Sequence, residues 1–269
     1  MKSATVQDGA QMVFHRVHIS SKVDIRRKLQ RGGFCHWQGG DLVYAPEAET
    51  FWQDLQAASS TLPRDEYCKA GNRYRRYAQY VTMPWSNTLQ PLPPGEYYQS
   101  AEYNAVDGGV GRWFAPLTPR EQLNPFLLGL IWFDLHQIPW PKKKFQRPIQ
   151  VGVHFVKHVA EPGRAGISSP DELHRDGEPY TFVHLVERSG VEGGVNTIAP
   201  LAYTGYQPTD VPPNDLLLQV VLTSPLDSFV VSDVAVCHHV SAVNVMPGYE
   251  RGSRSVLLIE FLPLIPEIV

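Results

Sequence analysis

Alternating apolar and polar positions dominate the second half of the chain. From residue 147 onward, short runs of β-branched and aromatic residues are separated by glycine, proline, asparagine and aspartate. In "IQVGVHFVKHV", the positions from Ile149 to Phe155 alternate between apolar residues and a mixed set that includes His154. Side chains of a strand point alternately to its two faces, so this pattern predicts a strand with one apolar face. The runs "YTFVHLVE", "LLLQVVLTS", "DSFVVSD" and "SVLLIEFL" predict further strands.

The first half of the chain shows helical periodicity at two places. In "PEAETFWQDLQAAS" four apolar residues recur at helical spacing and predict a helix with one buried face: Phe51, Trp52, Leu55 and Ala58. Further on, Thr118 and Glu121 have the spacing of a capping box, and Pro119 suits the first helical position. A second helix is therefore predicted from there to about His136, with Pro125 expected to kink it or to delay its start.

These elements predict a mostly β protein with flanking helices. Several short strands after a helical lead-in favour a jelly-roll core, the cupin-like double-stranded β-helix, with helices on its outer face. We find no repeat or flexible linker that would divide the chain, so we expect one domain over residues 1–269. Its mixed helical part would cover about 1–145 and its jelly-roll core about 147–263.

Charge and composition limit the classes of binding partner that the sequence indicates. With 24 basic and 27 acidic residues, the net charge of −3 indicates neither nucleic acid nor an anionic membrane surface as a partner. The longest apolar run, residues 126–135, is shorter than the roughly 20 residues of a membrane span, and the polar N-terminus shows no leader. Three widely spaced cysteines, Cys35, Cys68 and Cys237, favour a reducing compartment. We therefore expect a cytoplasmic protein with a small-molecule partner, either monomeric or a homo-oligomer.

The stretch "LHRDGEPY" places His174 and Asp176 two positions apart. Residues i and i+2 share a face only on an extended segment, so these side chains can converge if the segment is extended. A third ligand would complete the two-histidine, one-carboxylate triad of non-haem Fe(II) oxygenases. The sequence "VCHHV" offers His238 or His239 for this place.

An arginine follows the second histidine motif. Arg254 opens the strongly apolar run "SVLLIEF". A guanidinium group that enters a barrel interior is unfavourable unless it meets an anion, and its two-pronged donor geometry fits a carboxylate. We therefore expect Arg254 to bind a carboxylate beside the metal.

Longer stretches resemble a known family. The sequences "SSPDELHRDGEPYTFVHLVERSGVEGGVNTI", "LDSFVVSDVAVCHHVSAV" and "RGSRSVLLIEF" are similar to bacterial 2-oxoglutarate/Fe(II)-dependent dioxygenases that include L-isoleucine hydroxylases. The segments "NRYRRYAQY" and "YYQSAEYNAVDGGVGRWFAPL" extend the resemblance over most of residues 60–262. It implies Fe(II) as cofactor, 2-oxoglutarate and O2 as co-substrates, and hydroxylation of an unactivated C–H bond with release of succinate and CO2.

The resemblance also implies individual roles. It puts His238 at the ligand position, His239 at a position that is glycine in the family, and Arg254 on the arginine that holds 2-oxoglutarate, with Arg251 as the alternative. The carboxylate of Asp176 favours hydroxylation, because related halogenases have a small residue there. Ser232 and the "SAV" that follows the histidines depart from the family pattern beside the expected iron site.

Candidate substrate contacts are less sharply indicated. The resemblance implies a free L-amino acid, whose carboxylate needs a cationic partner. Arg73, Arg75 and Arg76 form an arginine cluster in an aromatic stretch and are candidates, although a solvated surface is the alternative. His154 is a candidate contact to substrate or co-substrate, and His184 either lines the cofactor pocket or is a structural histidine.

Two other functions remain open. A hydroxylase of protein or peptide side chains would share the iron site but would need an open groove. A jelly-roll protein that binds Zn²⁺ or Mn²⁺ without redox chemistry would share the ligands but would have no need of Arg254 as an anion partner.

Overall fold

The computed structural model describes residues 15–68, 72–103, 108–141, 147–168 and 170–264. Residues 1–14, to which the expectation about a leader applies, lie outside the described part. Within that part, no helix is both long enough and apolar enough to cross a bilayer.

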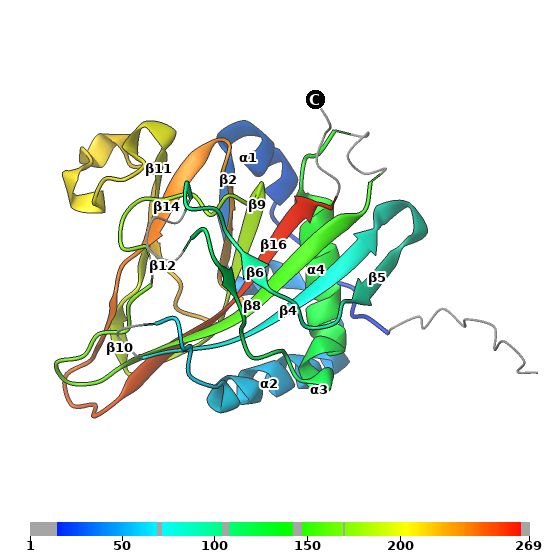
Figure 1. Ribbon diagram of the computed structural model, residues 1–269, viewed down its shortest axis with the longest axis horizontal. Helices are drawn as coiled ribbons and strands as arrows, with labels where there is room; N and C mark the ends of the chain where they lie inside the picture. Colours follow the sequence, from blue (N-terminus) through cyan, green and yellow to red (C-terminus); the bar gives the residue numbers. More distant parts are fainter. Residues whose placement is uncertain (1–14, 69–71, 104–107, 142–146, 169, 265–269) are drawn as a thin grey trace, which may run out of the picture.

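A seven-stranded antiparallel sheet forms the centre of the molecule (Figure 1). Its order is β2 (Phe34–Trp37), β13 (Ser228–Ser232), β9 (Tyr180–Ser189), β16 (Gly252–Pro263), β8 (Ile149–Ala160), β4 (Arg73–Met83) and β5 (Thr88–Pro91). The two longest strands, β8 and β16, pair along their whole length. They therefore place residues from two distant parts of the chain in a fixed register.

Smaller sheets complete the β structure. A three-stranded antiparallel sheet has the order β12 (Leu218–Val221), β11 (Val195–Pro200) and β14 (Val236–Val240). Three two-stranded pairs are β1 (Ser20–Ser21) with β3 (Leu42–Val43), β6 (Tyr97–Tyr98) with β7 (Gly111–Arg112), and β10 (Val191–Gly193) with β15 (Val243–Val245). Residues of the seven-stranded and three-stranded sheets share one apolar cluster, which includes Val156, Val256 and Ile198. The two sheets thus pack against each other, as in a jelly roll, and the predicted fold class is confirmed.

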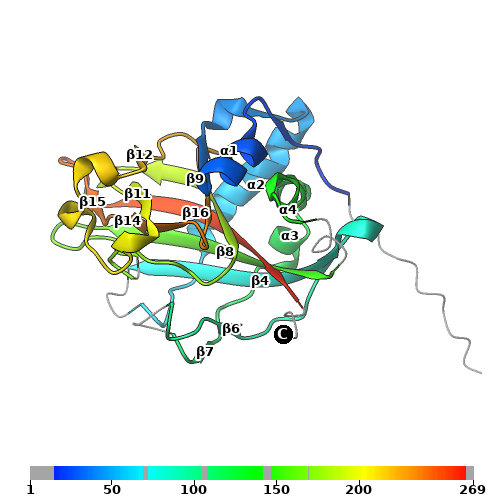
Figure 2. The same cartoon turned by 90° about the horizontal axis from the view of Figure 1, so that it is seen from above.

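Helices cover one side of the large sheet. In Figure 2, α1 (Ile25–Gly32), α2 (Glu49–Ala58) and α4 (Pro125–Gln137) lie together on one side of the long strands. The predicted helix at 51–58 is α2. The second predicted helix is split, because the Thr118 capping box starts the short α3 (Pro119–Gln122) and Asn124 caps a new helix at Pro125. Proline lacks an amide hydrogen and fits only a first helical turn, so it restarts the helix here.

The two faces of β8 have different neighbours. Ile149, Val151, Val153 and Phe155 belong to the main apolar cluster together with residues of α4. His154 and His158 lie on the opposite face, which lines an internal cavity. The alternation seen in the sequence therefore separates a helix-covered face from a face that carries chemistry.

The large sheet includes strands from the first half of the chain, whereas the β core was expected at 147–263. Strands β2, β4 and β5 all come from residues before 92, and β4 pairs with β8 over ten positions. The arginine-rich β4 escaped the periodicity argument, because Arg73 and Arg75 interrupt the apolar alternation with buried or half-buried cations. Their burial is possible only because tertiary partners surround them.

His184 joins the sheet to the helical layer. Its Nε2 lies 2.9 Å from Oδ2 of Asp134 on α4, and its Nδ1 lies 2.8 Å from Oγ of Ser228. Both side chains of the His184–Asp134 pair have no exposed surface. The structure thus supports the structural role for His184 and places it on the side of the sheet away from the cavity.

Replacing Asp134 by alanine should destabilise the protein strongly. A buried polar pair that loses one partner leaves the other unsatisfied, at a cost of about 3–5 kcal/mol in the free energy of unfolding. Asp54 is the matched control, because its ion pair with Arg120 is exposed and Asp54→Ala should cost less than about 1 kcal/mol. Chemical denaturation of both variants measures the difference, and equal losses would contradict the assignment of His184 to the core.

Candidate metal centre and its cavity

Reciprocal backbone hydrogen bonds bring His174 and His238 side by side. The amide of His174 donates to the carbonyl of His238 at 2.8 Å, and the amide of His238 donates to the carbonyl of His174 at 2.9 Å. This is an isolated antiparallel bridge between β14 and the segment before β9. Residues paired in this way point their side chains to the same side, and the two imidazole centroids lie 4.6 Å apart.

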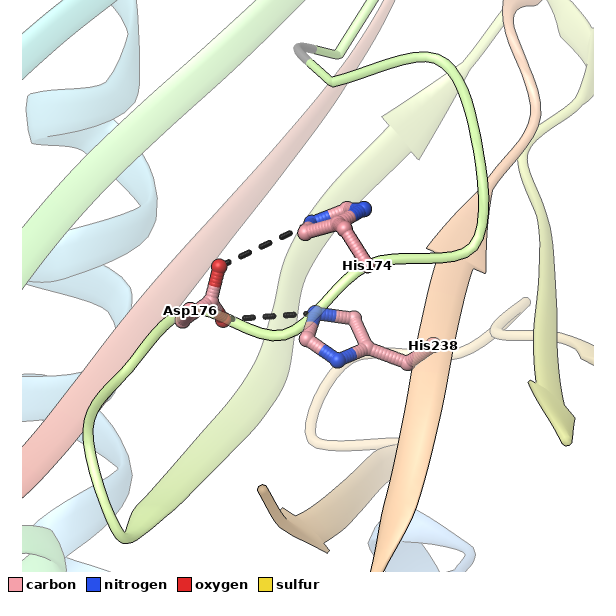
Figure 3. Close-up of side chains that lie close together, drawn as sticks. All are labelled: His174, Asp176 and His238. Atoms are coloured by element: carbon pink, nitrogen blue, oxygen red, sulfur yellow. Dashed lines mark ion pairs between the residues drawn. The ribbon is translucent and has the colours of Figure 1, made fainter. Parts of the chain in front are cut away.

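The carboxylate group of Asp176 faces both imidazoles (Figure 3). Its Oδ1 is 3.6 Å from Nε2 of His174, and its Oδ2 is 3.3 Å from Nε2 of His238. One donor atom of each residue lies within 4.8 Å of the other two. The expectation of an extended segment at His174 is met, because the backbone bridge requires it. Three such donors could hold one divalent ion on one face.

Local contacts fix these donors. Nδ1 of His174 lies 2.7 Å from the carbonyl oxygen of Glu172, so a proton on Nδ1 leaves Nε2 as the donor atom. After Asp176 the chain turns at Gly177, whose φ of +95° disfavours any side chain. Asp233 accepts the amide hydrogen of Gly177 at 2.6 Å and holds this turn in place.

The electrostatics of the cluster suit a cation. Burial alone would raise the pKa of Asp176, but the charges and hydrogen bonds of His238 and His174 hold it well below its usual value. Burial and the charge of Asp176 raise the pKa of Asp233 to about 7. Two carboxyl groups in one buried region thus repel each other, and a bound metal ion would relieve that repulsion.

His239 faces a different neighbour. Its Nε2 lies 3.2 Å from Oδ1 of Asp171, and it is not among the three clustered donors. The next residue of a strand points to the opposite face, so only one of the two adjacent histidines can join His174. The geometry favours His238, the residue that the family resemblance also placed there.

Arg254 is buried in the same cavity. It lies on β16 opposite His158 of β8 and is 3% exposed. Its Nη2 donates to Oδ1 of Asn196 at 3.4 Å, while its Nε is buried and has no hydrogen-bond partner among the described residues. Burial and the nearby Arg188 lower the pKa of Arg254 to about 10. Within the described part of the chain no carboxylate pairs with it, so the cavity offers an anion site at this end.

A cavity of about 110 Å³ connects these groups. Its lining includes the three clustered donors, Arg254, and polar residues of β4, β6, β7 and β8. Apolar side chains between the polar groups come from β8, β9, β13 and β16: Val156, Val183, Phe229, Val256 and Leu258. An apolar cavity with a few convergent polar groups is typical of a small-molecule site.

Comparison with known proteins identifies the family. The sequence profile described as 2OG-Fe dioxygenase matches residues 56–260. The chain belongs to the 2OG-Fe dioxygenase family. As a 2OG-Fe dioxygenase it uses Fe(II) as cofactor and 2-oxoglutarate and O2 as co-substrates, which confirms these three expectations.

Two curated relatives are similar along much of their length. The L-isoleucine-4-hydroxylase of Bacillus thuringiensis is 30% identical over 239 residues, which cover 87% of this chain and 92% of that protein. The 3(1)-hydroxy-L-isoleucine 4-dioxygenase of Pantoea ananatis (strain AJ13355) is 30% identical over 190 residues, or 64% of this chain and 72% of that protein. Among solved structures, IDO from Bacillus thuringiensis matches with a TM-score of 0.73 at 22% identity, over 90% of this chain and 99% of that chain. This structural match supports the same fold.

The residues present fit the Fe(II) and 2-oxoglutarate of a 2OG-Fe dioxygenase. His174, Asp176 and His238 are nitrogen and oxygen donors that suit Fe(II) and leave one side of the cluster open to the cavity. The buried guanidinium of Arg254 suits a carboxylate of 2-oxoglutarate. Arg251, the alternative to Arg254, is an exposed residue whose Nε lies 3.8 Å from Glu161.

The three arginines of β4 have separate places. Arg73 and Arg75 line the cavity, and both contact the buried Asp65, with Nε to Oδ2 distances of 2.7 and 3.4 Å. Arg76 points to the other face of the strand, where its Nε lies 3.7 Å from Glu121. Of the three candidates for the substrate carboxylate, Arg73 and Arg75 therefore face the cavity and Arg76 does not, because side chains alternate along a strand.

His154 lies in the cavity wall as well. Its ring stacks on Tyr77 at a centroid distance of 4.4 Å and meets the edge of Tyr97 at 4.6 Å. Burial and the charges of Arg75 and Arg112 hold the pKa of His154 well below its usual value. The ring is therefore neutral at physiological pH.

Sequence reasoning missed several cavity residues. Tyr97, Gln99 and Arg112 come from the β6–β7 pair and its flank, where short elements leave no periodic signal. Gln99 donates to the backbone carbonyl of Asp176 at 2.6 Å, so this segment also supports the metal cluster. Glu260 could have been found, because it is a carboxylate in an apolar strand, six positions after Arg254 and thus on the same face.

Substitution of His238 by alanine should abolish tight binding of Fe(II). The change removes one of three donors, whereas His239→Ala removes a neighbour that contacts Asp171 instead. Iron content after anaerobic loading and desalting measures the effect, with circular dichroism to show that both variants are folded. Iron retention in His238→Ala together with its loss in His239→Ala would reverse the choice between the two histidines.

Proposed function

We propose that the protein hydroxylates an unactivated C–H bond of a free L-amino acid or a closely related small molecule. The observation that carries this proposal is the convergence of His174, Asp176 and His238 in one cavity with the buried Arg254, which has no carboxylate partner in the described residues. We assign the first three residues as ligands of Fe(II), and Arg254 as the partner of the remote carboxylate of 2-oxoglutarate. Bound Fe(II) would couple oxidation of 2-oxoglutarate by O2, which yields succinate and CO2, to insertion of one oxygen atom into the substrate C–H bond.

The residues around Arg254 support its role with 2-oxoglutarate. His158, its neighbour on β8, has a pKa far below the usual value because of burial and the charge of Arg254. A neutral His158 adds hydrogen-bonding capacity without a second full charge, and Ser168 lies 3.2 Å from its Nε2. Val156 and Val256, which pair with each other on β8 and β16, also line the cavity. Their methyl groups would flank the aliphatic part of the co-substrate.

The substrate proposal rests on the two relatives and on the cavity. Both relatives are named for reactions of isoleucine or its hydroxylated form. Here Arg75 is the best candidate for the substrate carboxylate, because Arg73 lies closer to their shared partner Asp65 and Arg76 points away. His154 remains a candidate substrate contact. Arg75 also lies 4.6 Å from the ring centroid of Phe114, which fixes its orientation.

The alternatives are less well supported. A cavity of about 110 Å³ favours a small substrate over a protein or peptide, which would require an open groove. A protein that only binds Zn²⁺ or Mn²⁺ has no need for a second buried cation aimed into the same cavity. We also propose a cytoplasmic location, in line with the three free cysteines Cys35, Cys68 and Cys237.

Arg254→Ala should raise the KM for 2-oxoglutarate by about 10²- to 10⁴-fold. Loss of one partner from a buried charged pair costs about 3–5 kcal/mol, which corresponds to this range. Arg251→Ala is the matched control and should change the KM little, because Arg251 is exposed. Succinate formation at varied 2-oxoglutarate concentrations measures both constants. A larger effect of Arg251→Ala would show that the co-substrate is bound elsewhere.

Aliphatic L-amino acids should stimulate succinate formation above the uncoupled rate. Burial of a four-carbon side chain contributes only about 1.5–3 kcal/mol, so we expect several aliphatic amino acids to be accepted. The twenty amino acids are mixed with protein, Fe(II) and 2-oxoglutarate under air, and products are screened for a mass gain of one oxygen. Stimulation by a peptide or another metabolite, with none by amino acids, would refute the substrate proposal while leaving the metal assignment intact.

A further inference from the structure

The cavity has a second charged end, opposite Arg254. On the cavity side of the sheet, β16 presents Arg254, Val256, Leu258 and Glu260 in succession. Six residues of extended strand separate Arg254 from Glu260 by roughly 20 Å. A co-substrate held by Arg254 would fill one end of the cavity and reach the metal cluster. The end at Glu260 is therefore left for the substrate.

Glu260 is a buried carboxyl group with a neutral neighbour. Its side chain is 9% exposed, and Nε2 of His154 lies 3.4 Å from its Oε2. His154 carries no positive charge at physiological pH, because burial and two arginines lower its pKa. In the described residues Glu260 has no ion pair with a lysine or an arginine. The charges of Arg75 and Arg112 offset the desolvation of Glu260 only in part, because neither forms a direct ion pair with it in the described residues.

A second buried carboxyl group lies nearby. Glu178 is 8% exposed, and in the part of the chain that the structure describes its buried Oε2 has no hydrogen-bond partner. The hydroxyl of Tyr97 lies 3.4 Å from its Oε1. Burial and the charge of Asp176 raise the pKa of Glu260 to about 8. Its carboxyl group would therefore gain from a cationic ligand.

His154 provides an independent indication of a ligand. Within the described residues neither of its buried ring nitrogens forms a hydrogen bond, and Nε2 only approaches Oε2 of Glu260 at 3.4 Å. Stacking on Tyr77 and contact with Tyr97 prevent the ring from turning toward another partner. Buried polar atoms are normally satisfied, so a neutral ring nitrogen in a cavity wall indicates a donor or acceptor on the bound molecule.

We propose that Glu260 binds the α-ammonium group of the amino-acid substrate, with a ring nitrogen of His154 as a second acceptor. The inference rests on the proposed function and extends it by naming a residue that determines specificity. An ammonium group offers three donors and one positive charge, which match the carboxylate of Glu260 and the neutral imidazole of His154. Arg75, on the neighbouring strand β4, would take the carboxylate of the same molecule.

This arrangement also explains how the cavity could discriminate between the amino-acid substrate and 2-oxoglutarate. The substrate and 2-oxoglutarate both carry carboxylates, but only an amino acid carries a cation. Because its pKa is raised, Glu260 ionises when an ammonium group binds beside it, whereas a second molecule of 2-oxoglutarate brings no cation to this end. Discrimination thus comes from attraction of the ligand that carries an ammonium group.

The test compares two ligands on the Fe(II)- and 2-oxoglutarate-loaded protein without oxygen. L-isoleucine and 3-methylpentanoate share a carbon skeleton, but the latter lacks the ammonium group. Glu260→Gln should weaken L-isoleucine binding by about 10- to 100-fold in calorimetric titration, because one charge-assisted hydrogen bond is lost. It should change 3-methylpentanoate binding little. The exposed Glu192 gives the control variant Glu192→Gln, which should bind both ligands like the wild type.

The outcomes separate this inference from the proposed function. If wild-type protein binds neither L-isoleucine nor any other free amino acid, the proposed function fails, and this inference fails with it. If wild-type protein binds L-isoleucine and Glu260→Gln weakens both ligands equally or neither, only the inference about Glu260 is overturned. Should Glu260→Gln fold poorly, Glu260→Asp keeps the charge and must retain the preference for L-isoleucine over 3-methylpentanoate.

Discussion

The pair of backbone hydrogen bonds between His174 and His238 is the constraint on which the site depends. These residues are 64 positions apart (238 − 174), yet each donates its amide hydrogen to the other's carbonyl group. Hydrogen bonding of the backbone fixes the imidazoles side by side before any metal is considered. The turn at Gly177, held by Asp233, then returns Asp176 to the same point. The metal centre is thus built mainly by main-chain geometry, with the side chains only completing it.

One face of the central sheet packs against the helices, and the other face lines the cavity. Toward the helices, β8 and β16 present apolar residues such as Val153 and Ile259 to the buried α4. Toward the cavity, the same strands present His154, His158, Arg254 and Glu260. Packing of the first face against helices makes the strands rigid, and this rigidity holds the polar groups of the second face in register. Core stability and site geometry are therefore properties of the same strands.

Charge in the cavity is divided along the strand direction. Arg254 marks one end and Glu260 marks the other, while the donors of the metal cluster belong to the same cavity. Each of these groups is buried and incompletely paired within the described residues, a state that proteins seldom maintain without a ligand. The chemistry of these groups indicates the ligands that they would bind. Arg254 would bind a carboxylate, the three clustered donors a metal ion, and the Glu260 end a zwitterion. Stability of this arrangement is expected to increase when those ligands are present.

Local sequence determined the parts of this protein that depend on neighbouring residues. Alternation predicted β8 and the later strands, the periodicity at 51–58 predicted α2, and the Thr118 capping box marked a helix start. The spacing of His174 and Asp176 required an extended segment, because only there do positions i and i+2 share a face. The order of His174, Asp176, His238 and Arg254 along the chain was sufficient to suggest the chemistry.

Tertiary structure alone decided which face of each strand meets which neighbour. His154 and His184 both lie in apolar strands, but one faces the cavity and the other faces Asp134 of α4. Likewise Arg75 points into the cavity and Arg76 away from it, and β4 is a strand because Asp65 and β8 provide partners for its buried arginines. Sequence periodicity shows that two faces exist, but the pairing of strands distant in the chain determines what lies against each one. For that reason the triad could be proposed from sequence as a set, whereas the substrate wall was predicted only in part: His154 was a candidate, but Tyr97 and Gln99 were not.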